Sequence, residues 1–160
     1  MTKTLRHLGA LCVLAVGAIH LQQYAGAGYS AIPTIGVLFL LNSIACGVVG
    51  IGLLAPLGRP GAGRVKDTAA ALFALAGAAI AVTSLVMLFI SESTTLFGFS
   101  EAGYRAAVVA AIAAEAAATV LLVPVAVSHL RRLPRGARAT SGRGALRRPG
   151  APGRSGAQRT

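Results

Sequence analysis

No charged side chain occurs in residues 35–57, IGVLFLLNSIACGVVGIGLLAPL. The hydrocarbon core of a bilayer is about 30 Å thick, and a helix needs about 20 apolar residues to cross it. Because that layer offers the backbone no water, a spanning segment must satisfy its own hydrogen bonds, as a helix does. Residues 35–57 are therefore predicted to form a membrane-spanning helix.

Three further segments have the same character. Residues 68–90 carry no charge, and residues 106–130 are interrupted only by Glu115 and His129. The third segment, residues 8–24, is the shortest and contains His20. The sequence therefore predicts an all-α fold, a membrane-embedded four-helix bundle formed by residues 1–130. Its helices are expected at about 8–24, 35–57, 68–90 and 106–130.

The composition agrees with a membrane protein. Of the 160 residues, 55% are hydrophobic and only 12% are charged, whereas soluble domains carry about 25% charged residues. These values exclude a soluble globular enzyme, a disordered regulator and a disulfide scaffold. The two cysteines, Cys12 and Cys46, lie in apolar runs without a paired spacing and are expected to be small buried residues.

Most of the positive charge lies in residues 131–160, which hold nine arginines and no acidic residue. A segment of Arg, Gly, Pro, Ala and Ser cannot bury enough apolar surface to fold, so a disordered Arg-rich cytoplasmic tail is predicted. Its arginines are expected to attract anionic lipid headgroups. Nucleic acid is not an expected partner, because single-strand binders use stacking aromatic residues and this tail has none.

The charges between the helices predict the topology, since cytoplasmic loops carry excess Lys and Arg. Lys3 and Arg6 precede the first helix, and three basic residues with one acidic residue lie in residues 58–67. We therefore expect a multi-pass plasma-membrane protein with both termini in the cytoplasm. An alternative interpretation is that residues 1–27 are a cleaved signal peptide ending in Ala25-Gly26-Ala27.

Local signals predict how the helices begin and pack. Thr34 and Asp67-Thr68 are candidate N-caps. Small residues allow close helix contact in membranes, and alanines repeat every four residues in two helices, at Ala70, Ala74 and Ala78 and at Ala106, Ala110, Ala114 and Ala118. Five aromatic residues, Tyr24, Tyr29, Phe97, Phe99 and Tyr104, are expected to form an interfacial belt.

Each helix places a polar group in the outer half of the membrane, about 6 to 13 Å from its outer end. These candidate pocket residues are His20, Asn42, Ser84 and Glu115. An ionisable residue at such depth is a functional hypothesis by default. Glu115 has three possible roles. It is a protonated group that makes structural hydrogen bonds, a group that handles a proton or a ligand, or part of an interface with a partner subunit. Glu92 and Glu101 are either solvated or at the rim of the pocket.

No catalytic, cofactor or metal-binding motif is present in the sequence. His20 and His129 are predicted at opposite membrane surfaces, which does not suit haem, and the two cysteines do not form a dithiol. The favoured function is a non-enzymatic accessory or structural membrane protein, with a homo-oligomer or another membrane protein as partner. The alternatives are an oligomeric proton-coupled or small-solute permeation unit that uses Glu115, and a membrane redox subunit.

Two blocks, GYSAIPTIGVLFLLN at residues 28–42 and LFGFSE at residues 96–101, resemble segments of small four-helix integral membrane proteins of high-GC actinobacteria. In that family a histidine precedes the first block and an acidic residue follows the second, as His20 and Glu115 do here. The resemblance covers residues 8–130. It implies four helices and no particular activity. A looser similarity to DoxX-like proteins rests on the number of helices.

Overall fold

The computed structural model describes residues 2–55, 63–95, 97–98, 103 and 105–132. Four helices make up this part of the chain: α1 (Thr2–Gly26), α2 (Pro33–Leu54), α3 (Gly63–Ser93) and α4 (Ala106–Arg132). A short 3-10 helix, η1 (Tyr29–Ala31), joins α1 to α2. The predicted all-α four-helix fold is confirmed. The first two residues of the predicted tail, Arg131 and Arg132, instead belong to α4. The rest of the predicted tail, residues 133–160, lies outside the described residues, and so does Glu101.

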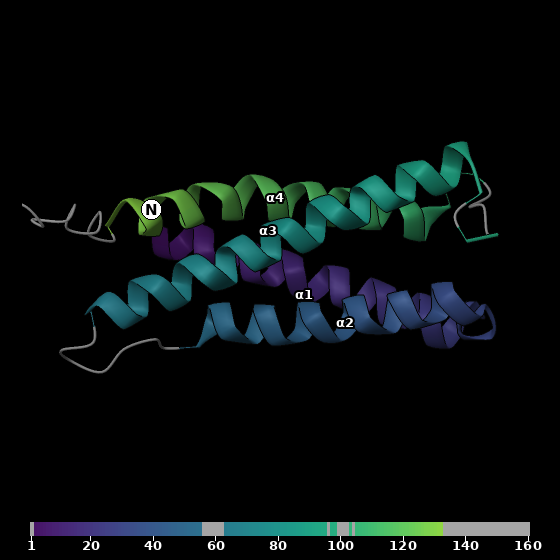
Figure 1. The fold of residues 1–160 in the computed structure, drawn as a ribbon, viewed down its shortest axis with the longest axis horizontal. Helices are drawn as coiled ribbons and strands as arrows, with labels where there is room; N and C mark the ends of the chain where they lie inside the picture. Colours follow the sequence, from purple (N-terminus) through teal and green to yellow (C-terminus); the bar gives the residue numbers. More distant parts are fainter. Residues whose placement is uncertain (1, 56–62, 96, 99–102, 104, 133–160) are drawn as a thin grey trace, which may run out of the picture.

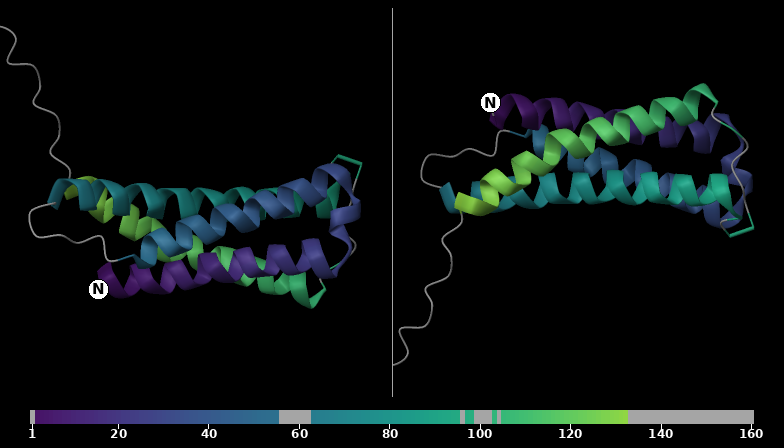
Figure 2. Two further views of the ribbon diagram at one scale, coloured as in Figure 1. Left: turned by 90° about the horizontal axis from the view of Figure 1, so that it is seen from below. Right: turned by 90° about the horizontal axis from the view of Figure 1, so that it is seen from above.

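The four helices run side by side along the long axis of the molecule (Figures 1 and 2). One end of the bundle, called the N-terminal end, holds the helix ends at Thr2, Leu54, Gly63 and Arg132. The opposite end, called the η1 end, holds η1 and the other four helix ends. Contacts are extensive between α3 and α4, α1 and α2, and α1 and α4, and sparser between α2 and α3. In Figure 1, α2 and α3 diverge toward the η1 end.

All four helices are long and apolar enough to cross a membrane. Many of their large apolar side chains point outward, and Val48, Ile51, Leu72 and Val120 are each more than half exposed. In water such a surface would be unfavourable, whereas lipid chains cover it at no cost. The bundle is therefore apolar on its outside as well as in its core.

The observed helix boundaries differ from the predicted ones. Helices α1 and α3 begin six and five residues earlier than expected, at Thr2 and Gly63, because uncharged residues alone defined the predicted limits. Helix α2 ends at Leu54 instead of residue 57, since Ala55 takes an extended conformation with φ −55° and ψ 139°. The long helices continue beyond an apolar layer about 30 Å thick.

The predicted N-caps are wrong. Helix α2 begins at Pro33, whose fixed φ suits the first helical turn, and its N-cap residue Ile32 offers no side-chain bond. Asp67 lies inside α3, and its Oδ1 atom is 2.8 Å from Nδ1 of His129 on α4. Asp67 therefore links the start of α3 to the end of α4.

The half of the bundle near the N-terminal end is filled by small and branched apolar residues. Val13, Leu53, Leu122 and Val125 are at most 1% exposed. A Cβ atom on Gly52 would lie 2.5 Å from Cε1 of Phe73, which shows how closely α2 approaches α3 here. The interior of this half is therefore mainly apolar, with the Asp67–His129 pair between α3 and α4 near its end.

The alanine stripe of α3 lies in the interior, since Ala70, Ala74 and Ala78 are all buried. The prediction for α4 is wrong in its first half, because Ala106 and Ala110 are exposed. The buried face of α4 instead passes through the residues Ala111, Glu115, Ala118 and Leu122.

Candidate functional site

A cavity of about 400 Å³ occupies the half of the bundle near the η1 end. All four helices and η1 contribute to its wall. Most of the wall is apolar, and the four residues that the sequence singled out all line it: His20, Asn42, Ser84 and Glu115. The rise of a helix predicts that these four residues lie at a similar depth, and in the structure they line the same cavity.

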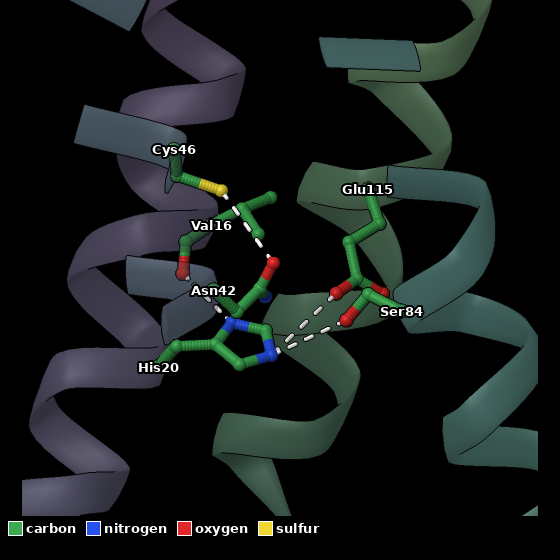
Figure 3. Close-up of polar contacts among 6 residues, drawn as sticks. All are labelled: Val16, His20, Asn42, Cys46, Ser84 and Glu115. Atoms are coloured by element: carbon green, nitrogen blue, oxygen red, sulfur yellow. Dashed lines mark hydrogen bonds and ion pairs between the residues drawn. The ribbon is translucent and has the colours of Figure 1, made fainter. Parts of the chain in front are cut away.

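His20 is held at both ring nitrogens (Figure 3). Its Nδ1 atom is 2.9 Å from the carbonyl oxygen of Val16, one turn earlier on α1. A carbonyl oxygen only accepts, so Nδ1 carries the hydrogen, and in the neutral ring Nε2 is then an acceptor. Ser84 of α3 places its hydroxyl 3.2 Å from Nε2 and donates to it. The imidazole therefore joins α1 to α3.

Glu115 of α4 is the most buried polar residue of the site, with 1% of its surface exposed. Its Oε1 atom lies 4.0 Å from Nε2 of His20, beyond hydrogen-bond distance. Its Oε2 atom is buried and has no hydrogen-bond partner. The backbone carbonyl of Glu115 accepts a bond of 2.9 Å from Thr119 Oγ1. One carboxyl oxygen is therefore left unsatisfied beside the cavity.

Asn42 of α2 presents a second unsatisfied atom. Its Oδ1 atom is 4.0 Å from Sγ of Cys46, a weak thiol donor one turn further along the helix. Its Nδ2 atom is buried without a hydrogen-bond partner. Figure 3 shows Asn42 on the His20 side of the cluster and Glu115 facing it from α4.

Aromatic side chains line the cavity toward the η1 end. Tyr29 stacks on Phe39 with 4.8 Å between ring centroids, and Phe39 lies 4.9 Å from the ring of His20. Arg105 donates a hydrogen bond to the Tyr29 hydroxyl and lies over its ring. Tyr29 is only 6% exposed, so its ring packs inward against the bundle. That the five aromatic residues form an interfacial belt stays a prediction.

The cavity reaches the surface between α2 and α3. Its exposed lining residues are Leu38 on α2 and Ala79, Thr83 and Met87 on α3. The last three follow at four-residue intervals and so form one edge along α3. Both sides of this mouth belong to segments apolar enough to span a membrane. The opening therefore faces the lipid-contacting side of the bundle.

The cavity has lining residues beyond the four that the sequence predicted. Tyr29, Phe39 and Gln23 line the cavity but were not predicted as site residues. One sequence signal could have indicated the position of Tyr29. Gly28 comes directly before it and adopts φ 84°, which allows the tight turn that brings the chain back over the end of the bundle. Glu92 is not among the lining residues, although its neighbour Ser91 is. The other predicted rim residue, Glu101, falls in the part of the chain that is not described.

Among the described residues, no three His, Cys, Asp or Glu side chains come together as a group that could hold a metal ion. His20 and His129 lie in opposite halves of the bundle, the latter beside Asp67.

Comparison of the chain with protein-family models, curated proteins and solved structures finds no match in any of the three. The resemblance to the actinobacterial four-helix family stays a prediction.

Proposed function

We propose that this chain is a non-enzymatic membrane protein that binds a small lipophilic molecule taken up from the bilayer. The observation that carries the proposal is the cavity: its wall is mostly apolar, its polar groups cluster at one place, and its mouth lies between α2 and α3. Sites for small molecules in proteins have this composition, with a few placed polar groups that fix orientation.

The size of the cavity suits a small ligand. At roughly 30 Å³ for each heavy atom, the space that one water occupies in the liquid, about a dozen heavy atoms would fill it. The lateral mouth, bordered by Leu38 and Met87, leaves room for a longer apolar chain to extend into lipid. A lipid-soluble molecule therefore fits both the volume and the position of the opening.

The apolar half of the bundle supports binding more than passage. Val13, Leu53 and Leu122 lie toward the N-terminal end from Glu115, in a cluster of buried apolar residues. An ion or polar solute that reached Glu115 would meet this packed apolar layer, which disfavours charge strongly. A single copy of the chain is thus better suited to hold a molecule than to conduct one.

The proposal includes the topology that the sequence predicts. The N-terminal end of the bundle would face the cytoplasm, with the tail arginines against anionic headgroups. Lys3 and Arg6 in α1 and Arg131 in α4 support it, because they lie at that end. The cavity would then open within the outer half of the plasma membrane.

The test is to fill the cavity. Ala111 is 9% exposed and lines it, whereas Ala113, two residues later on α4, is exposed on the lipid side. We expect Ala111→Phe to lower the amount of lipophilic molecule that co-purifies in mild detergent at least about fivefold. The measurement is mass spectrometry of organic extracts, normalised to protein, with Ala113→Phe as the matched control.

Two results would contradict the proposal. One is an extract from the wild-type protein that contains no molecule depleted in Ala111→Phe. The other is equal depletion in Ala111→Phe and Ala113→Phe, which would indicate a general effect of adding a ring to α4.

The predicted permeation unit is a second candidate, favoured by the nearness of two buried ionisable groups, His20 and Glu115. It would require an oligomer, because the core of one copy is packed. In this case Glu115→Gln should abolish a pH-dependent proton flux in proteoliposomes while the amount of assembled protein is unchanged. No flux in the wild-type protein, or an equal flux in both proteins, would exclude it.

A further inference from the structure

We propose that the polar group of the bound molecule is a hydroxyl, held between Asn42 Nδ2 and Glu115 Oε2. The ligand class is then a neutral amphipathic alcohol with an apolar chain. This inference rests on the proposed function of the cavity and specifies the chemistry that it selects.

The argument begins with the two unsatisfied atoms. Most buried polar atoms in folded proteins have a hydrogen-bond partner, and each exception requires an explanation. Asn42 Nδ2 and Glu115 Oε2 are both buried, both without a partner, and both belong to residues that line the cavity. They come from different helices, α2 and α4, and both atoms are closed to water while the cavity is empty. The proposed contact therefore requires the Asn42 amide and the Glu115 carboxyl to rotate toward the ligand, which side chains at a cavity wall can do.

Several other polar atoms around the cavity are already engaged. Both ring nitrogens of His20 are used, by Val16 and Ser84, and Asn42 Oδ1 faces the Cys46 thiol. Nearer the η1 end, Gln23 donates to Gln22 and Ser91 donates to a backbone carbonyl. Among the described lining residues, Asn42 Nδ2 and Glu115 Oε2 are the buried polar atoms that lack a partner.

The chemistry of these two atoms selects among polar groups. An amide NH₂ only donates, so the ligand must accept a bond from Asn42. An ionised Glu115 only accepts, whereas a protonated one also donates. A hydroxyl suits both states, because its oxygen accepts and its hydrogen donates. An ammonium group cannot accept from Asn42, and a ketone or ether cannot donate to an ionised Glu115.

The mouth of the cavity determines where the rest of the ligand lies. With the hydroxyl at Asn42 and Glu115, the apolar chain would pass Ile80 and leave between Leu38 and Met87. All three of these side chains are apolar. The predicted ligand is thus polar at one end only.

The experiment compares three radiolabelled probes of equal length: dodecanol, methyl undecyl ether and tridecane. Binding to the full-length protein in lipid nanodiscs is measured as a function of the probe's mole fraction in the lipid, which removes differences in partitioning. We expect dodecanol to bind at least about tenfold more tightly than tridecane, a difference of about 1.4 kcal/mol. The ether, which accepts but does not donate, should bind with intermediate affinity.

Variants locate the effect. Asn42→Leu should lower the preference for dodecanol over tridecane at least about threefold and leave tridecane binding unchanged. Ser128→Ala, which removes a hydroxyl from a residue outside the cavity, should leave the preference unchanged. If Asn42→Leu does not fold, the comparison of the three probes on the wild-type protein still decides the question.

The possible failures are distinguishable. Equal binding of all three probes, abolished by Ala111→Phe, would overturn the hydroxyl assignment and leave the lipophilic cavity intact. A preference for dodecanol that persists in Asn42→Leu would also overturn the assignment. Binding of no probe, or binding that Ala111→Phe does not affect, would overturn the proposed function as well.

Discussion

His20 shows how single residues can hold a membrane bundle together without a hydrophobic driving force. Lipid is as apolar as the core, so helices in a membrane associate through close packing and hydrogen bonds. The His20 ring connects the Val16 carbonyl of its own helix to the Ser84 hydroxyl of α3. Little direct contact otherwise joins α1 to α3. This bond is therefore a main connection between those two helices.

Ser84→Ala should destabilise the bundle modestly. Interhelical hydrogen bonds in membrane proteins contribute about 0.6 kcal/mol on average, so a loss of about 0.5 to 1.5 kcal/mol is expected. Unfolding in mixed micelles of increasing SDS fraction measures it. Thr83→Ala is the control, because Thr83 directly precedes Ser84 in the chain and its side chain is exposed. Equal stability of Ser84→Ala and the wild-type protein would show that the bond contributes nothing.

For single residues, the sequence predicted which polar side chains belong to the site but not which atoms they bond to. The rise of a helix fixes depth, so four polar residues could be assigned to one layer of the membrane. Which atoms meet depends on helix rotation, and this left the His20–Ser84 bond and the unsatisfied Asn42 Nδ2 undetermined. Tyr29 could not be assigned because η1 turns it inward, against Phe39.

Among the elements, α2 offers the sharpest test of packing because two of its glycines have opposite surroundings. A Cβ atom on Gly36 would lie 2.6 Å from the Tyr29 carbonyl oxygen and 3.1 Å from Ser30 Cα, both backbone atoms of η1. A Cβ atom on Gly47 would meet nothing within 4 Å. Gly36 therefore allows η1 to fold back against the start of α2.

Gly36→Ala should lower stability by about 1 to 3 kcal/mol, the usual cost of overpacking, because the backbone of η1 cannot easily move away. It should also weaken ligand binding, since η1 carries Tyr29 over the cavity. Gly47→Ala should leave stability unchanged or raise it, because alanine favours the helix. Thermal unfolding in detergent compares the two. A larger loss for Gly47→Ala would show that the contacts of α2 are assigned wrongly.

The helices themselves were predictable to a few residues, because length and hydropathy alone identify a spanning segment. The helix ends were less predictable, because α1 and α3 extend past their apolar segments and include charged residues such as Lys3 and Arg64. The packing face of α4 was predicted in part. The row that starts at Ala107 and includes Ala111 and Glu115 was expected to face the interior because its side chains are small around the acid, and Ala111 and Glu115 are buried. The alanine repeat from Ala106 was also expected to pack, but Ala106 and Ala110 are exposed, because the packing against α1 and α3 and not the spacing selects the buried face.

For the whole molecule, the proposed topology can be tested with single cysteines. Ser30 is exposed at the η1 end and Val65 is 71% exposed at the N-terminal end. In a background with Cys12 and Cys46 replaced by alanine, Ser30→Cys should react with a membrane-impermeant maleimide on intact cells. Val65→Cys should react only after the membrane is permeabilised. The reverse pattern would place the cavity in the inner half of the membrane.

The closed apolar core beneath Glu115 has a consequence for what the molecule could sense. Because Val13, Leu53 and Leu122 pack the core toward the N-terminal end, a ligand in the proposed cavity would exchange through the mouth between α2 and α3. Occupancy would then follow the concentration of that compound in a single leaflet, whatever the content of the other. Such a protein would act as a one-sided reservoir or gauge, with no means of moving its cargo across the membrane.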